Sequence, residues 1–161
     1  MQNYRLFILV SVLFLACGIA RAGVFADNEE LLTPAEAFKL EAEFIAANQI
    51  EVRYDIAPGY YLYRERFKFT TDTPGVKLGS IQFPAGVVHE DDFFGRVETY
   101  RLQLFVNLEL EIGTPAPAVI SLRVTSQGCA DIGVCFPPHE ETREVAADAT
   151  DRSGVSPKPG N

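Results

Sequence analysis

The chain has few cysteines, few basic residues and no apolar run long enough to cross a membrane. Its 161 residues include only 3 cysteines and 2 histidines, and 14 lysines and arginines stand against 22 acidic residues. The longest apolar stretch, from Leu6 to Ala16, is about half of the roughly 20 residues that a membrane helix needs. A transmembrane span is therefore not expected.

The N-terminus has the pattern of a secretory signal peptide over residues 1–22. Arg5 precedes the apolar stretch, and small residues ending at Ala22 mark a cleavage site. Cleavage after Ala26 and lipidation at Cys17 are the two alternatives. Removal of residues 1–22 leaves 12 basic residues against 22 acidic ones, a net charge of −10. Nucleic acid and anionic membrane surfaces are poor partners for such a charge.

The mature chain, of about 139 residues, suits one domain that can fold without a disulfide. Apolar residues alternate with polar ones over 38–44 and 50–56, which is typical of strands with one buried face. Further strands are predicted for "YYLYRERFKFT" (60–70), "VKLGSIQF" (76–83), "YRLQLFVNLELEI" (100–112) and "AVISLRVTSQGC" (118–129). Short strands separated by Pro/Gly turns predict an antiparallel β-sandwich.

Two segments depart from this pattern. The stretch "TPAEAFKLEAEFIAAN" begins like a helix, with Thr33 followed by Pro34 and by an acid three residues on. We expect a short turn followed by a strand, with a helix as the alternative. After Val145 the sequence is polar and aperiodic, so we predict a domain over 23–145 and a flexible tail or linker over 146–161.

Two cysteines, Cys129 and Cys135, remain after the signal peptide and are expected to pair in an oxidising compartment. Gly133 permits a positive φ between them, so a bridge across a hairpin-like loop is sterically reasonable. So short a loop gives about 2 to 3 kcal/mol in the chain-entropy model. Their spacing fits neither a zinc site nor a C-x-x-C motif. Spacing alone favours a structural disulfide, with a redox-active one as the alternative.

Three stretches resemble one known family. "QGCADIGVCFPP" (127–138), "PGYYLYRERF" (58–67) and "GVVHEDDFFGRVETY" (86–100) are similar to the N-terminal periplasmic domain of the thiol:disulfide interchange protein DsbD. The resemblance covers nearly the whole mature chain. It implies an all-β, immunoglobulin-like antiparallel sandwich in which the cysteine pair is catalytic.

Carried over to this chain, the resemblance assigns roles to both cysteines. Cys135 would form the mixed disulfide with a partner, and Cys129 would resolve it. One sulfur must be reachable by an outside thiolate while its neighbour displaces the partner, which agrees with such a division. Sulfur carries the chemistry, so no metal, flavin or nucleotide cofactor is implied.

The resemblance also implies a cap loop over the disulfide. The matching residues are Asp91, Asp92, Phe93, Phe94 and Gly95, with Phe93 as the aromatic lid. A ring over sulfur makes a weakly favourable contact and keeps stray thiols out. The alternative interpretation is that one phenylalanine is core and the other a surface aromatic.

Tyr61 and Tyr63 lie two apart on a predicted strand and therefore share a face. By resemblance they lie beside the cysteines, near Asp91 and Asp92. Hydroxyls or carboxylates there would move protons or raise a thiol pKa. An amphipathic pair at a sheet edge is the alternative. His89 is expected to be structural or solvated.

The family's partners follow from the resemblance. A thioredoxin-like domain would donate electrons, and periplasmic disulfide isomerases and cytochrome c maturation thioredoxin-like proteins would accept them. Family members continue into a membrane-embedded domain, which is expected here on this chain or on another. The protein would then be periplasmic, tethered to the inner membrane where the chain is longer.

The chain departs from the family's usual sequence at two positions. We expect both differences to affect the affinity for partners more than the redox chemistry. Phe94 stands where the family usually has a tyrosine, and Val88 stands where a tryptophan is frequent. The rival function is an immunoglobulin-like binding module in which the bridge merely fixes a hairpin. A structural bridge should have a potential below about −300 mV and resist exchange.

Overall fold

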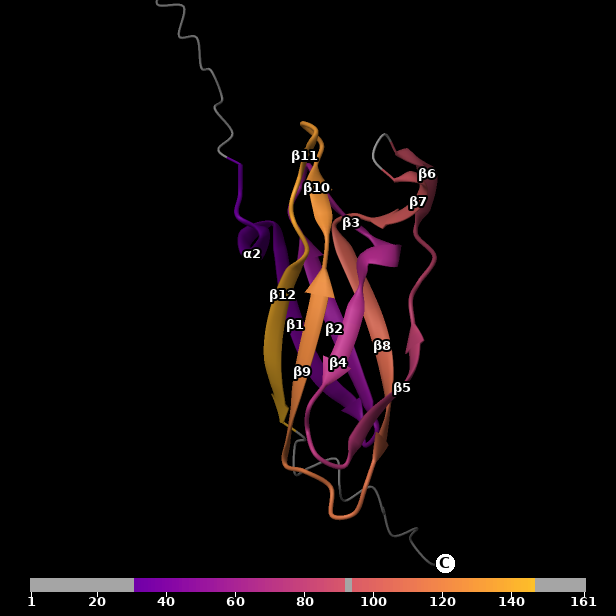
Figure 1. Cartoon of the computed structure of the whole chain (residues 1–161), viewed down its shortest axis with the longest axis vertical. Coiled ribbons are helices and arrows are strands. Elements are labelled where there is room, and N and C mark those ends of the chain that lie inside the picture. Colours follow the sequence, from indigo (N-terminus) through magenta and orange to yellow (C-terminus); the bar gives the residue numbers. More distant parts are fainter. Residues whose placement is uncertain (1–30, 92–93, 147–161) are drawn as a thin grey trace, which may run out of the picture. The chain divides into compact units, whose positions relative to one another are not determined.

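The computed structural model describes residues 31–91 and 94–146, which form antiparallel β-strands with very little helix (Figure 1). Several expectations lie outside these residues: the signal peptide at 1–22, the start of the domain at 23–30, the loop residues Asp92 and Phe93, and the tail from 147 onward. Within the described part, no helix is long and apolar enough to cross a membrane.

Two sheets pack face to face as a β-sandwich. The first has the strand order β1-β2-β8-β5 and the second β12-β9-β4. The first comprises β1 (Phe38–Ala46), β2 (Gln49–Ile56), β8 (Gln103–Ile112) and β5 (Val76–Gln82); the second comprises β12 (His139–Ala146), β9 (Val119–Ser126) and β4 (Lys68–Thr71). Figure 1 shows one sheet lying over the other. The predicted fold class, an all-β immunoglobulin-like antiparallel sandwich, is confirmed.

The alternating sequence pattern builds the core of this sandwich. In β2 and β9 every second side chain is buried, because successive residues of a strand point to opposite faces. The buried side chains of both sheets join in one cluster, whose fully enclosed members include Ile50, Val52, Leu104, Val106, Leu108, Ile120, Leu122 and Val124. Burial of these apolar side chains supplies the main stabilisation of the fold.

An arginine joins the two sheets at one edge of the sandwich. Arg143 of β12 donates from Nε to the backbone carbonyl of Leu40 on β1 at 3.1 Å. Its guanidinium also pairs with Glu141 at 2.6 Å. The side chain therefore satisfies an edge carbonyl that the β1-β2 ladder does not use.

A third sheet lies at one end of the sandwich, the upper end in Figure 1. Its strand order is β11-β10-β3-β7-β6. The strands are β11 (Val134–Cys135), β10 (Gly128–Ala130), β3 (Tyr60–Tyr63), β7 (Gly95–Tyr100) and β6 (Val87–Asp91). Both cysteines and both tyrosines singled out from the sequence belong to this end sheet.

The segment with a helix-like start forms one helical turn and then a strand. Helix α2 (Pro34–Ala37) is followed directly by β1. The Glu36 carboxylate accepts hydrogen bonds from the Thr33 backbone N–H at 2.9 Å and from its hydroxyl at 2.6 Å. The expected turn followed by a strand is therefore present, and the longer helix is not formed.

The single strand predicted over 60–70 is wrong. It divides into β3, the 3-10 helix η1 (Arg64–Arg66) and β4. β3 pairs with β10 and β7, whereas β4 pairs with β9. The three charged residues of η1 mark the point at which the chain passes from the end sheet into the sandwich.

The predicted strand over 100–112 is interrupted at its start. Tyr100 ends β7, Leu102 has a positive φ of 64°, and β8 begins at Gln103. β6, β7 and β12 are strands that the sequence analysis did not identify as strands.

Candidate active site

Cys129 and Cys135 face each other across the β10–β11 hairpin. Their Cα atoms are register partners 4.0 Å apart, and the sulfurs are bonded to each other. The intervening turn closes with a hydrogen bond of 2.9 Å from the Gly133 N–H to the Ala130 carbonyl. Gly133 has a φ of 86°, the left-handed conformation that glycine adopts without strain. The pairing and the role of Gly133 predicted from the sequence are both present.

The two sulfurs differ in accessibility. Cys129 lies on β10 between two neighbouring strands and is 0% exposed. Cys135 lies on β11, the edge strand of the sheet, and is only partly buried. Cys135 is therefore the more exposed of the two cysteines.

β3 brings both tyrosines to the disulfide. Tyr61 is the register partner of Cys129, and Tyr63 lies on the same face, with the two rings 5.4 Å apart edge to face. Tyr63 is 1% exposed and packs with Val97 and Cys129 in a small apolar cluster. The hydroxyl oxygen of Tyr63 lies 3.4 Å from the Cys129 sulfur.

The Tyr63 hydroxyl links the sulfur to a carboxylate. It donates a hydrogen bond of 2.7 Å to Oδ2 of Asp91, and the Tyr61 hydroxyl lies 3.4 Å away. Burial, then the Tyr61 hydroxyl and the nearby Asp91, raise the pKa of Tyr63 above its ordinary value. Tyr63 therefore stays a neutral phenol at physiological pH.

The described part of the expected cap loop packs on Tyr63. Asp91 ends β6, and its Oδ1 accepts a hydrogen bond of 3.0 Å from the Phe94 backbone N–H. The Phe94 ring meets the Tyr63 ring edge-on, with centroids 5.1 Å apart. Gly95 is the register partner of Asp91 and has a φ of 70°. Asp92 and Phe93, the expected lid, lie outside the described residues.

His89 lies on β6 on the same side of the sheet as Tyr61. The two rings are 6.4 Å apart and nearly perpendicular. His89 is partly buried. Across residues 31–91 and 94–146, no three His, Cys, Asp or Glu side chains are grouped so that they could hold a metal ion.

Two arginines at this site were not singled out from the sequence. The Arg66 guanidinium lies 4.1 Å from the centre of the Phe94 ring, and the Arg101 guanidinium lies 4.8 Å from the centre of the Tyr61 ring. Arg101 also makes a bidentate pair with Asp131, in the turn between the cysteines, at 2.7 and 3.0 Å. Both contacts join distant parts of the chain, so no local spacing identifies them.

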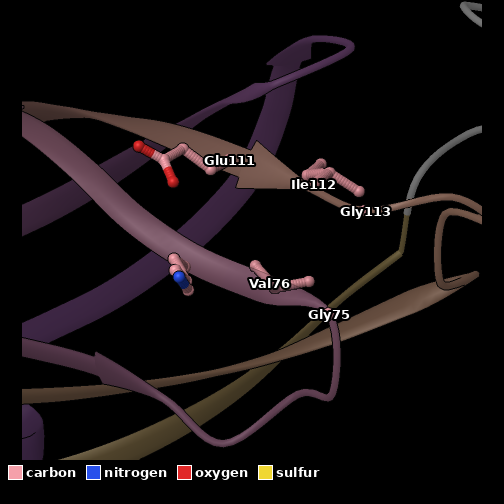
Figure 2. Close-up of a pocket in the computed structure, with 6 residues that line it drawn as sticks. Gly75, Val76, Glu111, Ile112 and Gly113 are labelled. Carbon is pink, nitrogen blue, oxygen red and sulfur yellow. The ribbon is translucent and has the colours of Figure 1, made fainter.

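Depressions of the described surface lie away from the two cysteines. One, of about 430 Å³, is lined by Gly75, Val76, Lys77, Glu111, Ile112 and Gly113 where β5 begins and β8 ends (Figure 2). In Figure 1 this is the opposite end of the sandwich from β10 and β11. None of these six lining residues carries a nucleophilic sulfur or hydroxyl.

Comparison with known proteins points to one family. The family model described as "Thiol:disulfide interchange protein DsbD, N-terminal" matches residues 28–147. Thiol:disulfide interchange protein DsbD 1 of Pseudomonas aeruginosa is 38% identical over 168 residues, covering 93% of this chain and 28% of that protein. DsbD 2 of the same organism is 35% identical, covering 81% of this chain and 21% of that protein. The chain thus spans less than a third of these relatives.

Solved structures agree with the sequence comparison. The N-terminal domain of DsbD from Neisseria meningitidis, in its reduced form, is 32% identical with a TM-score of 0.63 over 75% of this chain and 94% of that domain. The same identity and a TM-score of 0.58 relate this chain to a complex between the DsbD and PilB N-terminal domains from that organism, over 71% and 87% of the two chains.

Proposed function

Because the chain belongs to the family of DsbD N-terminal domains, we propose that it is a thiol:disulfide reductase module that works through a reversible Cys129–Cys135 bond. One observation carries the proposal: the bridge joins a partly exposed cysteine at a sheet edge to a buried cysteine whose sulfur contacts a tyrosine hydroxyl. A purely structural disulfide would stabilise the fold more if it joined strands that are distant in the sequence. This bridge instead joins cysteines with a sequence separation of only 6.

The cycle starts from the reduced pair. The Cys135 thiolate attacks one sulfur of a partner's disulfide, a mixed disulfide forms, and the partner's other sulfur leaves as a thiolate. Cys129 then attacks the Cys135 sulfur, which closes the intramolecular bond and releases the partner's second thiolate. Two electrons pass to the partner, and two protons move from the cysteines of this chain to the partner's thiols. A dithiol donor reverses these steps to restore the reduced pair.

Tyr63 and Asp91 support the second step. Cys129 is buried, so its thiol must give up a proton where bulk water is excluded. The Tyr63 hydroxyl stands 3.4 Å from this sulfur and is hydrogen-bonded to Asp91. When the thiolate forms, the Tyr63 hydroxyl would turn its single proton from Asp91 to the sulfur, and this hydrogen bond would stabilise the new charge.

We infer thioredoxin-like partners on both sides of the cycle, a donor domain and periplasmic acceptors such as disulfide isomerases and cytochrome c maturation proteins. The solved complex of a related DsbD N-terminal domain with the PilB N-terminal domain supports a protein partner for this site. We further propose a periplasmic location after removal of residues 1–22, and a membrane-embedded domain, on this chain or another, that supplies the electrons.

Mixed-disulfide trapping tests the proposal. A Cys129→Ser variant of the full chain keeps Cys135 and lacks the resolving sulfur, so oxidised thioredoxin-like protein should accumulate as a covalent adduct at Cys135. Non-reducing electrophoresis and peptide mass spectrometry detect and locate the adduct.

The matched control is Cys135→Ser, which leaves the buried Cys129. We expect little adduct from this variant under native conditions. Equal trapping by both variants would contradict the division of roles. Trapping by neither would leave the bridge as a structural element and favour the binding module.

A further inference from the structure

A stack of side chains leads from solvent to the buried sulfur, and its outermost member is an arginine. The Arg66 guanidinium covers the Phe94 ring at 4.1 Å, and Phe94 meets the Tyr63 ring at 5.1 Å. The Tyr63 hydroxyl then lies 3.4 Å from the Cys129 sulfur. Arg66 and Phe94 are exposed, whereas Tyr63 and Cys129 are enclosed.

The backbone explains why Arg66 stands above Tyr63. Tyr63 ends β3 and is the N-terminal cap of the 3-10 helix η1, and Arg66 is its last residue. Side chains three apart in a 3-10 helix lie on the same side, one above the other. The Phe67 N–H donates to the Arg64 carbonyl at 3.4 Å and closes this turn. Phe94, in the turn just before β7, contacts both Tyr63 and Arg66.

The neighbouring arginine of the same turn is engaged elsewhere. Arg64 points to β7, where its guanidinium donates two hydrogen bonds to Glu98 at 2.9 and 3.0 Å. Arg64 therefore fixes η1 to the hairpin, while Arg66 contacts the ring at its tip. The two arginines hold η1 and the β6–β7 hairpin together at two separate points.

We propose that Arg66 is a positioning residue that holds Phe94 on Tyr63 and so keeps the Cys129 side of the disulfide closed to small thiols and alkylating agents. This inference rests on the proposed function, in which premature reaction of Cys129 would lose electrons. A cation over an aromatic face is attracted by the negative potential of the ring. Release of Phe94 requires loss of that contact.

Alkylation of Cys129 measures this closure directly. In a Cys135→Ser background of the full chain, iodoacetamide is added under native conditions, and peptide mass spectrometry follows the modification of Cys129. Arg66→Gln should raise the alkylation rate about two- to fivefold, the factor that a cation–π contact at an exposed site is worth. Arg66→Lys keeps a cation but loses the planar stack, so its rate should lie between the two.

Two control variants distinguish loss of the Arg66–Phe94 contact from a general effect of charge on the alkylation rate. Arg96→Gln removes the same charge from an exposed position of the same hairpin, on the opposite face of β7 from Val97, and should leave the rate unchanged. Phe94→Leu should itself raise the rate, and adding Arg66→Gln to it should cause no further rise. Thermal unfolding of each variant verifies that the domain remains folded.

Three results would overturn the inference. The alkylation rate of Cys129 could be unchanged in Arg66→Gln, or Arg96→Gln could raise it as much as Arg66→Gln does. Arg66→Gln could also raise the rate by the same factor in the Phe94→Leu background as in the chain that keeps Phe94. The measurement needs no redox partner. A chain that fails to trap partners but shows the Arg66 effect would contradict the proposed function alone, whereas normal trapping without the effect would contradict the positioning role alone.

Discussion

At the scale of single residues, the buried sulfur of Cys129 lies beside a tyrosine hydroxyl. Tyr63 holds its hydroxyl beside Cys129 and donates a hydrogen bond to Asp91. In the oxidised pair the sulfur carries no proton, so the 3.4 Å approach is a contact between oxygen and sulfur. In the reduced pair the same geometry places a hydroxyl next to a thiol or thiolate, where it can exchange hydrogen bonds.

Tyr63→Phe should slow the resolving step about tenfold, because a hydrogen bond to a charged sulfur is worth about 1.5 kcal/mol or more. Stopped-flow or quenched-flow measurement of mixed-disulfide decay gives this rate. The control is Tyr100→Phe, which removes another buried hydroxyl, one that donates to the Pro84 carbonyl at 2.9 Å. If Tyr63→Phe resolves as fast as the parent chain, the hydroxyl has no part in the chemistry.

The sequence indicates some of these residues and not others. The cysteines and the tyrosine pair are recognisable from local spacing, because each pair lies on one short segment. Arg66 and Arg101 are not, since each contacts a ring brought close only by the fold. The placement of Asp91 beside Tyr63 also depends on a contact across 28 positions.

At the scale of elements, the Glu98 carboxylate is one of the groups that hold the β6–β7 hairpin, which carries Phe94. Glu98 of β7 accepts a hydrogen bond from the Gly86 backbone N–H, just before β6, and from Arg64 in η1. The Gly86 hydrogen bond, together with Arg64, holds the pKa of Glu98 below its usual range. The folded state therefore favours the ionised form of Glu98.

The lowered pKa of Glu98 determines the direction in which the free energy of unfolding changes with pH. The stabilisation from Glu98 is fully present above the ordinary glutamate pKa of about 4.3 and is lost as pH falls through the lower pKa of the folded state. Glu98→Gln should cost about 1 to 2 kcal/mol at pH 7, as expected for charge-assisted hydrogen bonds at a partly exposed site. The difference from the parent chain should shrink towards pH 3.

Urea unfolding at pH 7 and pH 3 measures this difference. Glu90→Gln removes an exposed carboxylate from the same hairpin and should have a small effect at both values. A cost of Glu98→Gln that is the same at pH 3 and pH 7 would show that the carboxylate charge is not what holds the hairpin.

Strands that bury one face in the sandwich core were predictable from the sequence, and strands of the end sheet were less so. β2, β8 and β9 alternate strictly, because the sandwich core covers one side of each. β6 has no fully buried side chain, and both Val87 and Val88 are exposed. Period-two alternation therefore has no physical cause there. η1 likewise depends on a change of sheet, which hydrophobic pattern alone does not reveal.

At the scale of the whole molecule, the sandwich and the site are joined at Gly128. β9 ends at Ser126 and β10 starts at Gly128, so this glycine is the first residue of the strand that carries Cys129. A Cβ there would overlap the Tyr61 carbonyl oxygen and lie 2.6 Å from Cζ of Phe38. The absence of a side chain lets the cysteine strand approach both β3 and the sandwich core.

Gly128→Ala should destabilise the domain by about 1 to 3 kcal/mol, the usual cost of overpacking, because backbone must move to accommodate the methyl group. Chemical unfolding followed by circular dichroism measures this. Gly79→Ala is the control, because its Cβ would come no closer than 3.3 Å to the Glu109 carbonyl oxygen. Equal stability of Gly128→Ala and the parent chain would mean that the close approach of β10 is not required.

The central claim is that the bridge transfers electrons, and its reduction potential tests this most directly. Alkylation and mass spectrometry across a dithiothreitol series give the equilibrium potential of the Cys129–Cys135 pair in the folded chain. We predict about −270 to −200 mV, the range of thioredoxins and glutaredoxins. A value well below about −300 mV, or a bridge that reacts only after unfolding, would identify a structural disulfide and contradict the proposed function.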